Sequence, residues 1–530
     1  MTSFSLRLIF ATTFCVACVS ATASRSAEVR APSQFRVGAV EGGLAVYGVE
    51  VARGVRTNEL QIPLEFNDMS IVLWQGDDKP DNLAGKKVVA IGGLEIDFDF
   101  GTQSIDEFPD YGDAWGKFSK IVIPEGVERL DSSAFEGCPQ LREITIPSTV
   151  KTIGSYAFSE CSALESVAIP EGCEIIGDAA FEDCVKLKKV VLPSTLQQIR
   201  EDAFSQCENL VEINLPESLQ KIGEEAFLGC KLITEANIPE GVERIDAAAF
   251  QGCESLRVVS LPASLDYMDG FDQDSEEDDF DETPNPFAEC PEIESFEVAP
   301  GNKDYASVDG VLFTKDKDVL LRYPSAKKET RYVVPDSATK IDAYAFENCY
   351  DVQEIVLSKN LTEIGAYAFA NCGDLTKLAL PNKLEQIGKG AFIRCNSLEK
   401  IVLPKGVKEI KDKTFFYCRS LKEVALPAKL ETIGDSAFAW CVSLPRIDVP
   451  EGVKLIPNQA FYRCGALREV ALPKSVKAID GEAFRSCDAS LRVHESSFAH
   501  NWAIENNRAF EIVPENETGK PGDKAAEKKE

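Results

Sequence analysis

Apolar and polar residues repeat along this chain with a period of 23 residues. In each repeat, a short alternating stretch such as Leu164, Val167 and Ile169 places its apolar side chains on one face, which predicts a short β-strand. A proline follows and ends the strand, because proline has no N–H to donate to a sheet. This proline keeps the 23-residue step through seven repeats: Pro124, Pro147, Pro170, Pro193, Pro216, Pro239 and Pro262.

The second half of each repeat predicts a turn that returns to the interior. Two apolar residues such as Val150 and Ile153 come first, followed by Gly154 or, elsewhere, by an aspartate such as Asp246. Glycine tolerates a turn and aspartate caps a helical turn, so we expect a helical turn here. The motif A-F-x-x-C then supplies the residues that pack inside it.

Phenylalanine and cysteine form two regular columns. Fourteen of the seventeen cysteines belong to this lattice, with Cys290 displaced by insertions. No single repeat can bury its apolar set alone, whereas stacked neighbours bury it continuously, so the sequence predicts an α/β solenoid of about fifteen strand-turn units with N- and C-terminal caps. The two regular cysteine runs are Cys138, Cys161, Cys184, Cys207, Cys230 and Cys253, then Cys349, Cys372, Cys395, Cys418, Cys441, Cys464 and Cys487.

The unit I-P-x-x-V-x-x-I-G-x-x-A-F-x-x-C-x-x-L-x-x-I resembles the BspA-type leucine-rich repeats of bacterial and protist surface proteins, over roughly residues 88–513. Residues 302–335 resemble the hairpin-bearing insert of that family, and 491–513 its terminal strand–helix–strand unit. The segment before the repeats resembles the family's N-terminal cap, with additions around 68–84 and 94–118 that obscure the register of the first turn. The resemblance implies adhesin-like or host-contact roles and no known catalytic activity.

The ends of the chain predict export. Arg7, an apolar run over 8–19 and the A-x-A site at 21–23 are typical of a secretory signal peptide. We therefore expect the mature protein to be secreted or at a cell surface. The expected organisation is a signal peptide (1–23), an N-terminal cap with a divergent first turn (24–120), a first run of repeats (121–262), an acidic loop with the hairpin insert (263–345), a second run (346–487), a C-terminal cap (488–513) and a disordered tail (514–530).

Charge and composition argue against several functions. The net charge of −31 disfavours nucleic acid and anionic membranes, which need a basic face. The stretch beginning at His494 starts like a zinc-protease motif, but Phe498 stands where the second histidine is required. No nucleophile elbow or phosphate-binding loop is present, so we expect no enzyme, no metal and no cofactor. The run 269–282 holds nine acidic residues in fourteen and is interpreted as a solvated loop, with calcium binding as the alternative.

The cysteine column raises the question of disulfides, which are usual in exported proteins. Strands in a sheet lie about 4.8 Å apart, so parallel Cβ vectors leave neighbouring Cβ atoms about 4.8 Å apart. A disulfide favours about 3.8 Å. We therefore expect buried free thiols, with cysteine acting as a small hydrophobic residue.

Variation between equivalent surface positions predicts a partner site. Between the column phenylalanine and the column cysteine lie two positions, named here the first and second intervening positions. In the first run they are mostly polar or small, as at Ser159, Glu182 and Ser205. In the second run they become aromatic, aliphatic or arginine, the residue types of binding hot spots. We name this set the aromatic–arginine patch: Ile393, Arg394, Phe416, Tyr417, Trp440, Tyr462, Arg463 and Arg485.

A column of small, nearly uncharged residues within the strands, including Thr145, Ala168 and Ala471, would face the concave side of a curved solenoid and is a second candidate surface. Steric crowding on the inner curve also favours small residues and is the preferred explanation. The leading hypothesis is that the protein binds an extracellular or cell-surface protein or glycan, without binding nucleic acid or inserting into a membrane. The alternative is an envelope or matrix spacer without a specific ligand. The patch could also be packing, if its side chains fold back to cover gaps between turns.

Overall fold

The computed structural model describes residues 118–271 and 285–514, together with the backbone of six strands before residue 92. The predicted signal peptide, most of the acidic run and the C-terminal tail lie outside the described residues. The chain divides into two compact units: unit 1 ends at Cys290, and unit 2 comprises 271–274 and 291–530. Each unit is described by itself.

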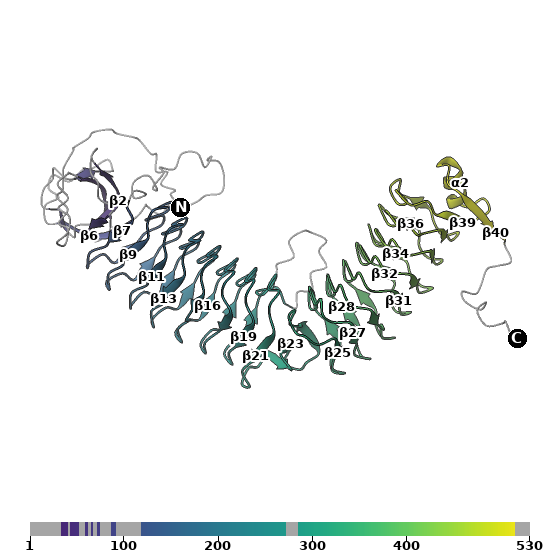
Figure 1. The fold of residues 1–530 in the computed structure, drawn as a ribbon, viewed down its shortest axis with the longest axis horizontal. Helices are drawn as coiled ribbons and strands as arrows, with labels where there is room; N and C mark the ends of the chain where they lie inside the picture. Colours follow the sequence, from purple (N-terminus) through teal and green to yellow (C-terminus); the bar gives the residue numbers. More distant parts are fainter. Residues whose placement is uncertain are drawn as a thin grey trace, which may run out of the picture. The chain divides into compact units, whose positions relative to one another are not determined.

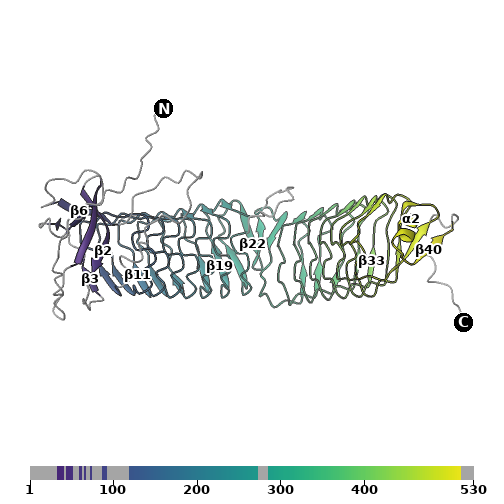
Figure 2. The same cartoon turned by 90° about the horizontal axis from the view of Figure 1, so that it is seen from above.

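Both units are β-solenoids built from parallel strands, and the part of the chain that the structure describes makes about 17 turns, slightly more than the predicted fifteen. Figure 1 and Figure 2 show the turns of each unit stacked as successive rungs. Each full turn contributes one strand to each of two lanes. In unit 1 the first lane contains β7 (Lys120–Val122), β9 (Glu143–Thr145), β11 (Ser166–Ala168), β13 (Lys189–Val191), β15 (Glu212–Ile213), β17 (Glu235–Asn237) and β19 (Val258–Leu261).

The second lane of unit 1 is made of two-residue strands that follow each proline. They are β8 (Arg129–Leu130), β10 (Thr152–Ile153), β12 (Ile175–Ile176), β14 (Gln198–Ile199), β16 (Lys221–Ile222), β18 (Arg244–Ile245) and β20 (Tyr267–Met268). Equivalent residues pair across neighbouring turns, as Val167 does with Val190 and Ile176 with Ile199. The 23-residue period therefore sets the register directly.

Unit 2 repeats this plan. Its first lane contains β21 (Ser295–Val298), β25 (Arg331–Val333), β27 (Glu354–Val356), β29 (Lys377–Leu378), β31 (Lys400–Val402), β33 (Glu423–Ala425), β35 (Arg446–Asp448), β37 (Glu469–Ala471) and β39 (Ser490–His494). Its second lane contains β26 (Lys340–Ile341), β28 (Glu363–Ile364), β30 (Gln386–Ile387), β32 (Glu409–Ile410), β34 (Thr432–Ile433), β36 (Leu455–Ile456) and β38 (Ala478–Ile479).

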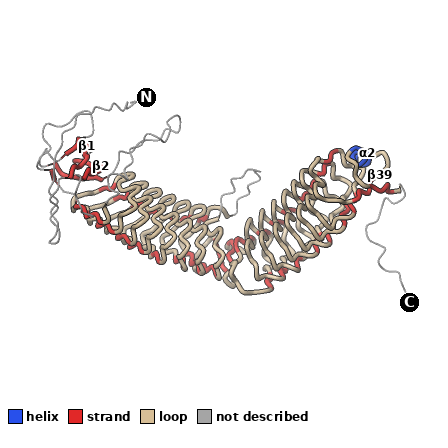
Figure 3. Tube along the Cα trace, turned by 45° about the horizontal axis from the view of Figure 1, so that its top comes forward, coloured by secondary structure: helices blue, strands red, loops and turns tan. Residues whose placement is uncertain are grey.

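The predicted helical turn is wrong, although the predicted solenoid is confirmed. In the described residues α2 (Phe498–Glu505) is the one α-helix, and loops join the strands elsewhere (Figure 3). Nearly every turn has a pair of left-handed residues four positions apart, such as Ala179 (φ 51°) just before the A-F-x-x-C segment and Asp183 (φ 54°) within it, and this pair interrupts any helix. The freed N–H groups donate to the next turn instead, as Phe181 does to the carbonyl of Ala203 at 2.8 Å.

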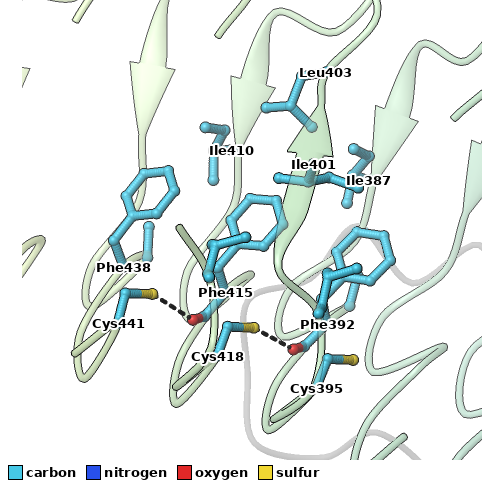
Figure 4. Close-up of a cluster of buried hydrophobic side chains, with 14 of the residues drawn as sticks. Ile387, Phe392, Cys395, Ile401, Leu403, Ile410, Phe415, Cys418, Phe438 and Cys441 are labelled. Carbon is cyan, nitrogen blue, oxygen red and sulfur yellow. Dashed lines mark hydrogen bonds between the residues drawn. The ribbon is translucent and has the colours of Figure 1, made fainter. Parts of the chain in front are cut away.

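The phenylalanine column forms the centre of each unit. Phe204 stacks on Phe181 at 5.3 Å and on Phe227 at 5.5 Å between ring centroids, and Phe415 stacks on Phe392 at 5.5 Å and on Phe438 at 5.4 Å. Phe204 and Phe415 are both fully buried, which confirms the column assignment. Figure 4 shows three of these rings beside the cysteines of the same turns.

The cysteines are free and buried throughout the described residues, as predicted. The Sγ of Cys418 donates to the carbonyl of Phe392 at 3.0 Å, and that of Cys441 donates to Phe415 at 3.2 Å (Figure 4). The same bond joins Cys207 to Phe181 at 3.2 Å in unit 1. Most column thiols therefore supply a hydrogen bond between turns, which a disulfide would remove.

The strands before residue 92 settle the register of the first turn. They are β1 (Ser33–Val40), β2 (Gly43–Val51), β3 (Glu59–Gln61), β4 (Glu65–Phe66), β5 (Val72–Trp74) and β6 (Lys86–Ile91). β3 pairs with β7 so that Leu60 lies opposite Ile121, and β6 pairs with β8 so that Ile91 lies opposite Leu130. β1 and β2 form an antiparallel pair, and β2 adds to β6.

The insert in unit 2 contains the expected hairpin. β22 (Tyr305–Val308) and β23 (Val311–Thr314) pair antiparallel, and β24 (Val319–Arg322) returns the chain to the second lane beside β26. Tyr323 replaces the column phenylalanine and stacks on Phe346 at 5.1 Å. Its neighbour Arg322 is buried, donates to the carbonyl of Tyr344 and lies 3.5 Å from a carboxylate oxygen of Glu347.

Unit 2 ends in the expected order of strand, helix and strand. β40 (Phe510–Val513) pairs in parallel with β39, and α2 lies between them in the sequence. The ring centroids of Trp502 in α2 and of Phe484, the last ring of the phenylalanine column, lie 6.0 Å apart. Arg508 donates to the carbonyl of Phe484 at 2.8 Å, the group that accepts a thiol bond in earlier turns.

Candidate functional site

The second intervening position has the same backbone in every turn. Its φ is positive in unit 1, as at Glu160 (59°), and also in unit 2, as at Tyr417 (64°) and Trp440 (63°). The N–H at this position donates to the next turn, so that Tyr417 bonds the carbonyl of Ala439 at 2.9 Å. A left-handed backbone suits glycine, asparagine and aspartate, and is uncommon for bulky residues.

Four aromatic side chains of the patch form one contact series on this backbone. The rings of Phe416 and Tyr417 lie 5.0 Å apart, Tyr417 stacks on Trp440 at 4.7 Å, and Trp440 meets Tyr462 edge-on at 6.2 Å. All four side chains are half-buried. The solenoid step therefore brings residues from three consecutive turns into a single surface cluster.

Guanidinium groups cover this series. Arg463 lies 4.5 Å from the centroid of the Trp440 ring and 5.3 Å from that of Tyr462. Arg419 lies 4.9 Å from the centroid of Tyr417. Cation–π contacts of this kind are worth about 0.5–1 kcal/mol at exposed sites. They hold the flexible arginines in place without neutralising their charge.

The other predicted patch residues are less closely joined. Arg394 is exposed and stands one turn before Tyr417 in the same column, bonded through its N–H to the carbonyl of Phe416 at 2.8 Å. Ile393 is half-buried. Arg485 is exposed and forms an ion pair with Glu482 at 2.8 Å. Ile393 and Arg485 thus flank the ring series rather than build it.

One assumption about the first intervening position needs correction. We expected a solvent face there, but Ser159 and Ser205 are buried, and Ala439 is fully buried in the second run. This position turns partly toward the neighbouring turns, so its residues cover the solenoid edge. The outward position is the second one, where Arg394 and Arg463 are exposed and Glu160 and Asp183 are exposed in unit 1.

Sequence reasoning missed Arg419 because it follows the column cysteine and lies outside the two positions that we compared. Comparing the next column as well would have found it. A further aromatic pair, Tyr344 stacked on Tyr367 at 5.2 Å, stands two residues before the column phenylalanine in the earlier turns of unit 2. The aromatic character of unit 2 therefore extends beyond the predicted patch.

The corresponding surface of unit 1 is acidic. Burial raises the pKa of Glu182, Glu201, Asp202 and Glu225, and neighbouring carboxylates raise it further. A cavity of about 380 Å³ lies nearby, lined in part by Asp178, Glu201 and Lys221. The basic side chain of Lys221 in this cavity is paired, since it lies 2.8 Å from Asp246. The cavity is also remote in sequence from the aromatic–arginine patch.

The described residues show neither a thiol activated for nucleophilic chemistry nor a group of side chains placed to hold a metal ion. Burial raises the pKa of Cys418 to about 12 and that of Cys173 to about 11, and a protonated buried thiol is a poor nucleophile. Within residues 118–271 and 285–514, no group of three His, Cys, Asp or Glu side chains is arranged to hold a metal ion. In the same part of the chain, no helix is long and apolar enough to cross a bilayer.

Comparisons with known proteins agree with the repeat. A family model described as the BspA type leucine rich repeat region matches residues 109–232, 174–271, 325–420 and 385–511. No curated protein matches the chain. A leucine-rich repeat protein from Bacteroides ovatus is similar in structure, with 23% identity, 91% of this chain and 98% of that chain covered, and a TM-score of 0.46.

Two further solved structures are similar. A leucine-rich repeat protein from Eubacterium ventriosum has 22% identity, with 76% of this chain and 89% of that chain covered and a TM-score of 0.46. The pneumococcal vaccine antigen PcpA has 20% identity, with 91% of this chain and 96% of that chain covered and a TM-score of 0.42.

Proposed function

The chain belongs to the BspA-type leucine-rich repeat family, and on that premise we propose that it is a secreted or surface-exposed protein that binds a protein or glycan partner through the aromatic–arginine patch. Leucine-rich repeat proteins are generally non-enzymatic scaffolds. A solenoid suits such a role, because stacked repeats present extended surfaces whose exposed positions vary while the core stays constant.

The observation that carries this proposal is the placement of Tyr417 and Trp440 at left-handed positions. A left-handed backbone costs a non-glycine residue roughly 1–2 kcal/mol. Equivalent turns use Gly229, Gly252 and Asn371, so the fold itself does not require a large ring there. Strained positions that persist are characteristic of functional surfaces.

The test is a triple replacement of Tyr417, Trp440 and Tyr462 by serine. Aromatic anchors contribute about 2 kcal/mol or more each to binding, so capture from an extract of extracellular matrix or host-cell surface should be strongly reduced. The folded state of the triple variant should lose at most about 3 kcal/mol, because each ring is only half-buried and the replacements together remove three ring–ring contacts. Capture is quantified on immobilised protein, and stability by urea denaturation.

The matched control replaces Glu160, Asp183 and Gln206 by serine, since these residues hold the outward position in unit 1. Ser159 and Ser205 are unsuitable as controls, because these two serines are buried. Capture should be unchanged in the control. A triple variant that loses clearly more than about 3 kcal/mol of stability would identify the rings as packing residues.

The alternative is a structural spacer without a specific ligand. It is favoured if the wild-type protein captures nothing from either extract, or if the triple replacement leaves both stability and capture unchanged.

A further inference from the structure

Three of the arginines around the ring series form no ion pair with a described carboxylate. Arg394, Arg419 and Arg463 are exposed, and the last two contact rings instead of acids. Acidic residues outnumber lysine and arginine by 87 to 56, and other arginines of unit 2 are paired, as Arg446 is with Asp448 at 2.9 Å. These three arginines, unlike Arg485 of the patch, therefore concentrate positive charge without an ion-pair partner on an acidic protein.

The faces of the central rings are already occupied. Tyr417 has Trp440 stacked against it at 4.7 Å and the Arg419 guanidinium over its ring at 4.9 Å, so these two groups cover much of the ring. Trp440 is enclosed in the same way by Tyr417 and by Arg463 at 4.5 Å. Stacking a sugar ring requires an open aromatic face, and at both rings protein groups already compete for that place.

What the patch presents to a partner is ring edges and guanidinium N–H groups. Ring edges carry partial positive charge and also contact apolar side chains well. A guanidinium held against a ring keeps its planar fork of donors, which matches a carboxylate through two parallel hydrogen bonds. Both features favour a partner that combines carboxylates with apolar groups.

We infer that the patch recognises an extended acidic polypeptide segment, an inference that rests on the proposed binding function. Arg394 and Arg463 stand three turns apart in one column, which is about 14 Å at about 4.8 Å per turn. An extended chain advances about 3.3 Å per residue, so carboxylates four residues apart reach both arginines. Residues four apart in a strand also point to the same side, which leaves the side chain midway between them facing the rings.

The experiment measures binding of a labelled polyglutamate peptide of about fifteen residues by fluorescence anisotropy at low and moderate salt. A double variant, Arg394→Gln with Arg463→Gln, should weaken binding about tenfold or more, because it removes two charge-assisted contacts. Glutamine already occupies this backbone position at Gln206, so the variant should fold. Arg142→Gln with Arg257→Gln is the matched control, since both arginines are exposed in unit 1 and give the same change in net charge.

Equal weakening in the control double variant would show nonspecific charge attraction and overturn the inference. So would absence of polyglutamate binding, or tighter patch-dependent binding of a heparin oligosaccharide, which would make the partner an anionic glycan. Concentration-dependent self-association that the patch double variant abolishes would support the inference and identify a second copy of this acidic chain as the partner.

The extract assay separates this inference from the proposed function. If capture is lost in the serine triple variant but retained in the patch arginine variant, the binding function stands and the acidic partner is wrong. If capture is unaffected by either variant, the proposed function itself fails.

Discussion

Units 1 and 2 share one backbone at the second intervening position and fill it with opposite chemistry. In unit 1 the left-handed residues are Gly137, Gly229 and Gly252, with acidic or amide side chains between them. In unit 2 asparagines come first, and then Arg394 and Tyr417 begin a series of large residues. Packing therefore fixes this backbone while leaving its side chains free. The large residues at this position in unit 2 reflect something other than folding.

The inner columns give the opposite result, because they are the same in both units. Phe204 and Phe415 have equal burial and nearly equal stacking distances, and Cys207 and Cys418 make the same thiol bond to the preceding turn. Constancy inside and divergence outside is the behaviour expected of a repeat protein, in which each turn must bury its neighbours.

The greatest loss of stability is expected when a ring of the shared core is removed. Phe204→Ala and Phe415→Ala should each destabilise the protein by about 3–5 kcal/mol, because each removes a fully buried ring and leaves a cavity. Nearest-neighbour coupling should extend the damage to adjoining turns, which hydrogen exchange detects. Urea denaturation measures the loss. A variant that unfolds like the parent would mean that the two columns are not equivalent.

The next effect concerns the thiols. Burial raises the pKa of Cys418 to about 12 from an ordinary value of 9.0, so the unfolded chain ionises first as the pH rises. The stability that this thiol contributes is fully present below pH 9 and is lost between pH 9 and 12. At a pH near 10.5 the loss is about 2 kcal/mol per such thiol.

Comparing Cys418→Ala with the parent at neutral pH and near pH 10.5 measures this contribution, because the variant should lose less stability on alkalinisation. Thiol reagents should find few reactive groups in the native protein and nearly all of them in denaturant. Groups that stay unreactive in denaturant until a reductant is added would show a disulfide-bonded column.

Much of the fold follows from the sequence because the inner columns repeat without exception over long runs. The strands, the phenylalanine column and the free thiols depend only on spacing and on the distance between stacked strands. The predicted helical turn is wrong because local preference does not decide this backbone: alanine favours a helix and disfavours the left-handed region, yet Ala179 adopts φ 51°. Only the hydrogen bonds to the next turn, such as that from Phe181 to Ala203, decide between them.

The candidate site was predictable in part for a related reason. The change of residue type between equivalent positions of the two units identified Tyr417, Trp440 and Arg463. Successive turns stack on one another, so these side chains lie together. The burial of Ser159 and Ser205 depends on how far each turn is rotated toward its neighbour, which composition does not reveal. Arg419 reaches Tyr417 across its own turn, so no comparison limited to the two intervening positions could find it.

A smaller effect tests the conformational cost of the outward column. Arg394→Asn should stabilise unit 2 by up to about 1 kcal/mol, because asparagine tolerates a left-handed backbone better than arginine and Arg394 is exposed without an ion pair. The reverse change in unit 1, Gly252→Arg, should destabilise by about 1 kcal/mol at φ 69°. Chemical denaturation of both variants should show opposite signs; the same sign in both would mean that the backbone cost is not shared.

The smallest effect tests the acidic surface of unit 1. The pKa of Glu201 is raised first by burial and then by Glu224, Asp202 and Asp178. A raised carboxyl pKa means that its stabilising contribution is present below the unfolded pKa and is lost as the pH rises through the folded pKa. At neutral pH the charged form therefore disfavours the native state, and Glu201→Gln should stabilise by a few tenths of a kcal/mol because the group is largely exposed and screened. The gain should disappear near pH 4, where the parent carboxyl is protonated, and shrink in high salt.

Glu165→Gln is the control, since Glu165 lies 3.4 Å from Lys188 and its loss should give no gain. If the Glu201→Gln gain persisted at pH 4, repulsion among carboxylates would not be its cause, and the electrostatic contrast between the two units would have to rest on the arginines of unit 2 alone.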